Sequence, residues 1–197
     1  MKLAAGTFRL VLLATALLFG PGAWACGYHD PASINRGILN WIYPNALYVT
    51  SAVWRAQLDG QLSRDDRPLA TKKLLGYGSA VKQLSRLRDG LWRVRDGNGD
   101  PAIALLMIEP MLWTRFEPAH TGLDMKPDAG GPASNDVVII TDEPVVKALV
   151  DGRVTPRAAR ELGLIRIYGV ASAVQNVTAW LDRLSQPALE EAVKPNG

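Results

Sequence analysis

The chain has 197 residues, 48% of them hydrophobic and 21% charged, which is typical of a globular domain. Its 22 basic and 19 acidic residues give a formal charge of +3, and the first 25 residues hold two of those cations and no acid. The rest of the chain therefore carries 20 basic against 19 acidic residues, about +1. This near-neutral balance argues against a nucleic-acid-binding protein, which needs a strong positive field.

Residues 1–25 have the pattern of a secretory signal peptide. Lys2 and Arg9 form a positive start, and an apolar run of ten residues, too short to span a membrane, follows. Ala23-Trp24-Ala25 is a cleavage site of the small–x–small type. We therefore expect cleavage near Ala25 and a periplasmic or secreted protein. The alternatives are an uncleaved anchor and a lipoprotein attached through Cys26, and bulky Trp24 disfavours the lipoprotein.

The first part of the remaining chain is predicted to be helical. Apolar residues recur at helical spacing over residues 34–42, 45–58 and 74–88. Asp59-Gly60 is a typical end for the second of these helices.

Strand patterns dominate the middle of the chain. Residues 91–94 alternate in polarity before an Asp-Gly-Asn-Gly-Asp turn at 96–100, which predicts a β-hairpin. Residues 102–108, 111–116 and 137–140 are predicted to be strands of one antiparallel sheet. Residues 117–135, rich in Gly, Pro and Asp, are predicted to form a long surface loop, either a lid or an insert without regular structure.

The last part mixes helices with one strand. Thr141 is predicted to cap a helix that ends at Gly152, and Thr155-Pro156 to begin a short helix that ends at Gly163. A strand over 164–168 and an amphipathic helix over 170–184 follow. Residues 26–185 are thus predicted to be a single α+β domain, an antiparallel sheet covered by helices, with a frayed tail over 186–197.

The segment VVIITDEPVVKALVDGRVTPRAARELGLIRIYG, residues 137–169, resembles the C-terminal part of the sterol carrier protein domain family. The shared pattern is a strand, an acidic helix start at 141–143, a helix ended by Gly152, a short helix after Pro156 and a strand that closes at Gly169. The resemblance implies an α+β fold with an apolar lipid-binding tunnel and no catalysis. It assigns no specific ligand residue.

Catalytic signatures are absent from the sequence. The chain has two histidines, His29 and His120, and no Gly-x-Ser-x-Gly motif, so no nucleophile–base pair indicates an enzyme. Its single cysteine, Cys26, excludes a disulfide within the chain. Cys26 and His29 offer a thiolate and an imidazole three residues apart, which makes copper or zinc handling, or a redox accessory role, the alternative hypothesis.

The continuous apolar run from residue 103 to 108 indicates a strand that is buried on both faces. Helices could fill both sides, or one side could hold a ligand under the 117–135 segment. Leu106, Ile108, Met111 and Trp113 are the predicted ligand-binding residues. We therefore expect a non-catalytic exported module, without a cofactor, that binds an apolar small molecule or another exported protein.

Overall fold

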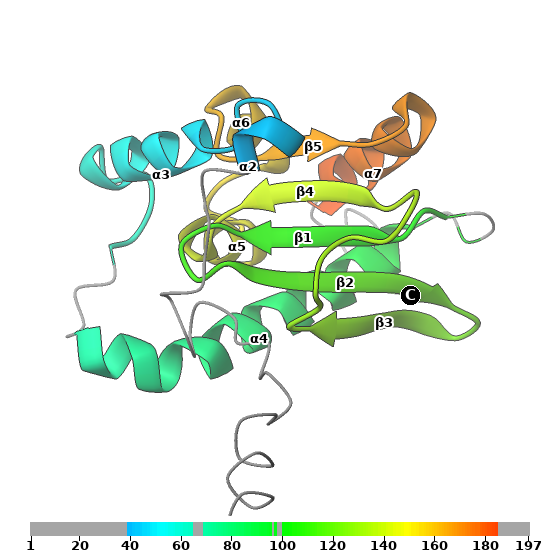
Figure 1. The fold of residues 1–197 in the computed structure, drawn as a ribbon, viewed down its shortest axis with the longest axis horizontal. Coiled ribbons are helices and arrows are strands. Elements are labelled where there is room, and N and C mark those ends of the chain that lie inside the picture. The colour runs from blue at the N-terminus through cyan, green and yellow to red at the C-terminus, as the bar shows by residue number, and fades with distance from the viewer. Residues whose placement is uncertain (1–38, 65–68, 96, 98–99, 185–197) are drawn as a thin grey trace, which may run out of the picture.

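The computed structural model describes residues 39–64, 69–95, 97 and 100–184. A five-stranded sheet forms its centre, with helices packed on it (Figure 1). The predicted signal peptide, the Cys26–His29 pair and the C-terminal tail lie outside the described residues. In chain order the elements are α2 (Leu39–Ile42), α3 (Tyr48–Leu58), α4 (Leu69–Val94), β1 (Ile103–Met107), β2 (Leu112–Ala119), β3 (Gly122–Pro127), β4 (Val137–Thr141), α5 (Glu143–Val150), α6 (Pro156–Glu161), β5 (Arg166–Tyr168) and α7 (Ala171–Leu184).

The α+β class is confirmed, but the sheet is mixed rather than antiparallel. Its strand order is β3-β2-β1-β4-β5, and β1 and β4 run parallel, with Ile103 opposite Val137 and Met107 opposite Thr141. The parallel pair arises because the chain after β3 crosses back over the sheet before β4 begins (Figure 1). Both central strands are buried at every position, which explains their continuous apolar sequences.

The predicted hairpin at residues 91–100 is wrong. Residues 91–94 are the last turn of α4, because Leu91 continues the buried stripe of Leu84 and Leu87 at helical spacing. The chain leaves the helix at Arg95, whose guanidinium forms a 2.5 Å ion pair with Asp100 and donates to the carbonyl of Gly122.

The predicted long loop at 117–135 is also wrong over most of its length. β2 continues to Ala119, and β3 is an edge strand that pairs with β2 in register, Phe116 opposite Met125. Edge strands tolerate Gly, Pro and charged residues because one edge of the strand faces solvent. The amino-acid composition of β3 is therefore similar to that of a loop. The hypothesis that this segment is a lid is therefore wrong for Gly122–Pro127, which form a strand of the sheet. The part of the predicted loop after β3 connects it to β4 and crosses the sheet (Figure 1).

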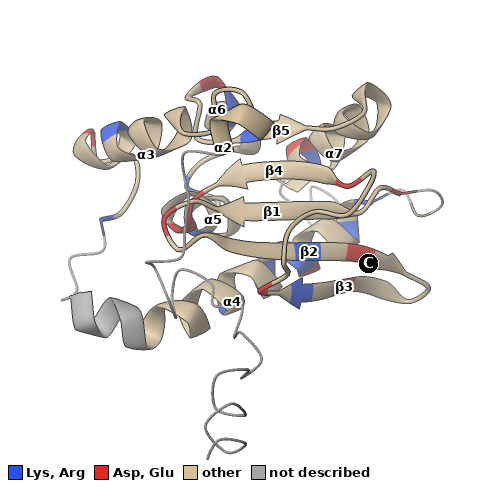
Figure 2. Ribbon diagram, in the orientation of Figure 1, with Lys and Arg blue, Asp and Glu red and all other residues tan. Residues whose placement is uncertain are grey.

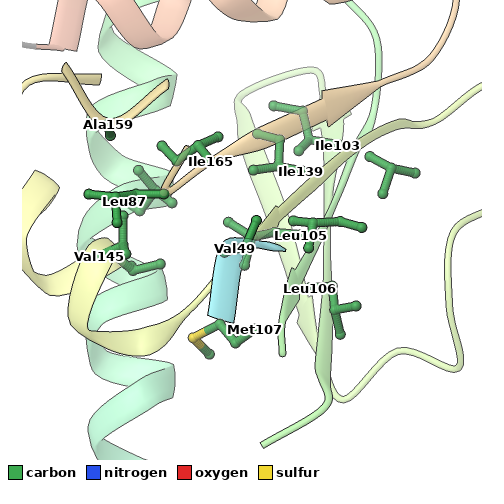
Figure 3. Packing of buried hydrophobic residues seen from close by; sticks show 14 of the residues in the cluster. Val49, Leu87, Ile103, Leu105, Leu106, Met107, Ile139, Val145, Ala159 and Ile165 are labelled. Carbon is green, nitrogen blue, oxygen red and sulfur yellow. The ribbon is translucent and has the colours of Figure 1, made fainter. Parts of the chain in front are cut away.

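The two faces of the sheet have different neighbours. Leu112, Thr114 and Phe116 of β2 are fully buried on the side of α4, α5 and α7, which lie behind the sheet in Figure 1. On the other face, Trp113 and Arg115 are only half-buried. Figure 3 shows how the helical side is filled, with Leu87 of α4 drawn between Val145 of α5 and Ile165.

Candidate functional site: a groove beside Arg93

A groove of about 400 Å³ opens on the helical side of the molecule. Its walls come from α4, the end of α5, the segment that leads into α6 and the last residue of α7. The apolar lining consists of Leu87, Leu149, Val150, Val154, Pro156 and Leu184. The polar lining side chains are Arg86, Arg93 and Thr155.

Helix ends shape one wall of the groove. After α5 the chain turns at Gly152, whose φ of +67° is a conformation that glycine adopts without steric cost. Three residues later Thr155 caps α6, its hydroxyl oxygen accepting a 3.2 Å hydrogen bond from the amide of Ala158. Pro156 follows at the first helical position, where no backbone donor is needed. The wall is thus fixed by the two helix ends.

The opposite wall depends on a glycine within α4. A Cβ atom added at Gly90 would lie 2.8 Å from Cδ2 of Leu184, so the missing side chain lets α7 approach α4 closely. Glycine inside a helix costs about 1 kcal/mol relative to alanine. At Gly90 the absent side chain makes room for Leu184, and both residues line the groove.

The two arginines of the lining have different partners. Arg86 forms a 2.8 Å ion pair with Asp151, which also pairs with Lys147 at 2.7 Å. Hydrogen bonds from Lys147 and Arg86 lower the pKa of Asp151 to about 2. Arg93 is exposed, donates a 3.3 Å hydrogen bond to the backbone carbonyl of Asp89 and has no ion pair with any described residue. Its charge is therefore available to an anion at the rim.

The four ligand-binding residues predicted from the sequence lie elsewhere. Leu106 and Trp113 are brought together as opposite residues of β1 and β2. Ile108 is buried, and Met111 lies in the turn between these strands with a φ of +51°. None of the four lines the groove. Their role in binding stays a prediction.

Trp113 instead belongs to an aromatic cluster. The ring of Tyr43 lies 6.3 Å from that of Trp113 and 5.2 Å from that of Tyr168, between centroids. The Tyr168 hydroxyl donates a 2.7 Å hydrogen bond to the carbonyl of Pro44. Burial, and secondarily the charge of Asp136, raises the pKa of Tyr43. The cluster ties the segment after α2 to the face of the sheet opposite α4.

Sequence reasoning missed the groove because its residues come from four segments that only the fold assembles. No local signal indicated the groove, because Gly90 lies between the helix predicted over 74–88 and the strand predicted over 91–94. The metal alternative cannot be placed, since Cys26 and His29 lie outside the described residues. Over the described part of the chain, no group of three or more His, Cys, Asp or Glu side chains could hold a metal ion. Nor is any described helix long and apolar enough to cross a membrane.

Comparisons with known proteins find likeness only among solved structures. No family model matches, and neither does any curated protein sequence. A crystal structure of sterol carrier protein 2 is 18% identical, with 55% of this chain and 91% of that chain covered and a TM-score of 0.40. A ubiquinone synthesis protein, UbiJ-SCP2, is 18% identical over 62% of this chain and 100% of its own, with a TM-score of 0.35. A conserved hypothetical protein of Thermus thermophilus is 18% identical over 57% of this chain and 89% of its own, with a TM-score of 0.30. This weak likeness agrees with the resemblance of residues 137–169 to the sterol carrier protein domain family, and no functional residue is carried over from it.

Proposed function

We propose that this protein is exported and that it binds an amphiphile with an apolar body and an anionic head group in the groove beside Arg93. The observation that carries the proposal is the combination of an apolar lining with one arginine that has no ion pair among the described residues. Export is proposed from the sequence pattern of residues 1–25.

The size and lining of the groove suit a small amphiphile. Its volume of about 400 Å³ lies within the range of small-molecule sites, roughly 300–1,000 Å³. Leu149, Val154 and Leu184 are half-buried, so an apolar chain placed against them would remove further apolar surface from water. Apolar contacts of this kind favour binding without selecting one chain length.

The charge at the rim selects the head group. A guanidinium binds carboxylates and phosphates through two parallel hydrogen bonds. Arg86 is already neutralised by Asp151, whereas Arg93 is not neutralised by any described residue. The lining contains no carboxylate, histidine or cysteine, so the described residues of the groove offer binding rather than catalysis.

Titration with palmitate and with hexadecanol tests the proposal, because the two share a chain and differ in head-group charge. Arg93→Gln should weaken palmitate binding roughly tenfold, equivalent to about 1.4 kcal/mol, and leave hexadecanol binding almost unchanged. Arg88→Gln is the matched control, since Arg88 lies on the same helix, pairs with Asp89 and does not line the groove. Failure to bind either probe, or an equal effect of both substitutions, would contradict the proposal.

A further inference from the structure

Five large apolar side chains are exposed within one short stretch of the chain. Trp41 is 89% exposed, and Ile42, Tyr48, Trp54 and Leu58 are each more than half exposed. All five belong to α2 and α3 or begin them, and we call them the α2–α3 surface. The other large exposed apolar residues of the described chain are scattered over α4 and the region from residue 162 onwards.

The fold does not need this surface for its own core. α3 is anchored by Val49, Val53 and Ala56, which are all buried. At 100° per residue, Trp54 and Leu58 project from the opposite side of the helix. The short α2 lies beside the start of α3 in Figure 1. Large apolar side chains exposed together on two neighbouring helices indicate a contact surface.

The charge and composition of the surface favour a phospholipid bilayer. Residues 39–64 contain only three charged side chains, Arg55, Asp59 and Arg64, which leaves the surface nearly uncharged (Figure 2). Arg55 has no ion pair with any described residue, so its cation is available to lipid phosphates. Trp and Tyr concentrate at membrane–water interfaces, where an apolar ring and a polar atom are both satisfied. A bilayer also accepts protruding side chains without a matching pocket.

A hydrogen bond connects the chain just after α3 to the segment that contributes to the groove. Nη1 of Arg153 donates a 2.7 Å hydrogen bond to the hydroxyl oxygen of Ser63, five residues after Leu58. Arg153 lies between Gly152 and Val154, which both line the groove. The chain that follows α3 is therefore held against the segment between α5 and α6.

We infer that the α2–α3 surface docks on a phospholipid bilayer, so that the groove exchanges amphiphiles with the membrane. The exchange rests on the function proposed above, while the docking itself is measured without any groove ligand. Trp41, Trp54 and Leu58 would insert among the lipid head groups, and Arg55 would meet their phosphates.

Vesicle co-sedimentation tests the inference with protein isolated after expression of the full chain. The vesicles are made of phosphatidylcholine, or of an equimolar mixture of phosphatidylcholine and phosphatidylglycerol. Trp54→Ala/Leu58→Ser should weaken vesicle binding roughly tenfold or more, because two half-exposed apolar side chains are removed. Trp92→Ala/Leu75→Ser removes the same residue types from α4, where Leu75 is as exposed as Leu58 at 53%, and should leave binding unchanged. Trp41→Ser, at an 89% exposed position that the core does not use, should weaken binding without affecting the fold.

The outcomes separate docking from ligand binding. Loss of vesicle binding in the α2–α3 variants, with palmitate affinity in solution retained, supports the inference. Absence of vesicle binding by the unaltered protein, or equal loss in both double variants, overturns it. A concentration-dependent dimer that the Trp54→Ala/Leu58→Ser variant abolishes would also overturn it, because a second copy would then cover the surface. If vesicles bind as expected while Arg93→Gln has no effect on palmitate, docking stands and the proposed groove function fails.

Discussion

Arg115 of β2 reaches across β1 to Asp136, which lies just before β4. Its Nε and Nη2 donate hydrogen bonds of 2.8 and 3.1 Å to the two carboxylate oxygens of Asp136. Ala104 is opposite Arg115 in register, and its small side chain leaves room for the guanidinium to pass. Arg115 also pairs with Glu117, which in turn accepts a 2.5 Å hydrogen bond from Lys126. This network fixes the crossing segment onto the sheet.

Arg115→Met should destabilise the protein by about 3 kcal/mol, because the Asp136 side chain, only 3% exposed, would lose its cationic partner. Lys126→Met is the control, since Lys126 is 61% exposed and exposed ion pairs contribute about 1 kcal/mol or less. Urea unfolding measures both free energies. Equal small losses would show that the buried pair is no stronger than the exposed one.

Asp142 should make stability depend on pH. Burial raises the pKa of Asp142 to about 7, with smaller contributions from the charges of Glu109 and Glu143, while backbone hydrogen bonds from Glu143 and Glu109 oppose the rise. Since the unfolded pKa is 3.8, the folded state holds the proton more tightly. The added stability is fully present below about pH 4 and is lost as the pH rises through about 7.

Asp142→Asn should remove this pH dependence while keeping an N-cap for α5, because Asn caps as well as Asp. At pH 8 the variant should be more stable than the unaltered protein, by an amount on the order of a few kcal/mol. Unfolding free energies between pH 4 and 8 check the slope, with exposed Asp89→Asn as the control. An unchanged slope in Asp142→Asn would mean that another group titrates.

Gly90→Ala should narrow the groove without unfolding the protein. The added Cβ meets only the end of the flexible Leu184 side chain, and alanine favours the helix by about 1 kcal/mol over glycine. We expect a stability within about 1 kcal/mol of the unaltered protein and weaker binding of palmitate. Thermal unfolding and titration measure the two effects. Gly78→Ala in the same helix, where no atom lies within 4 Å of the added Cβ, should leave binding unchanged.

Trp113→Ala distinguishes the groove from the site predicted by the sequence. A ligand held beside Arg93 should not respond to this substitution, because Trp113 does not line the groove. If binding of palmitate is instead lost in Trp113→Ala and retained in Arg93→Gln, the ligand lies near Leu106 and Met111. Fluorescence titration of both variants decides between these locations.

Processing of the N-terminus is measured by intact mass. Cleavage after Ala25 should leave Cys26 as an unmodified first residue, because Ala23-Trp24-Ala25 fits signal peptidase and Trp24 does not fit a lipoprotein signal. A diacylglycerol adduct on Cys26 would contradict this.

The same protein should be assayed for copper(I) and zinc binding. Cys26→Ser and His29→Ala should each weaken binding if the metal hypothesis holds.

Local sequence determined most of the elements. Some features depend only on neighbours a few residues away, so they can be predicted without the fold. They are the helix start at Thr155-Pro156, the helix end at Gly152 and the apolar runs of β1 and β4. Thr141 is a partial exception. It ends β4 and donates its hydroxyl to the carbonyl of Leu164, while Asp142 is the residue that caps α5.

Tertiary structure alone decided the rest. The parallel pairing of β1 with β4 depends on where the chain returns after β3, and β3 itself is a strand only because β2 offers it an edge. The Arg115–Asp136 pair spans 21 residues, and Arg86 meets Asp151 across 65. The groove assembles α4, α5 and α7 around Gly90. Such contacts depend on chain reversals and packing, which no periodicity within one segment encodes.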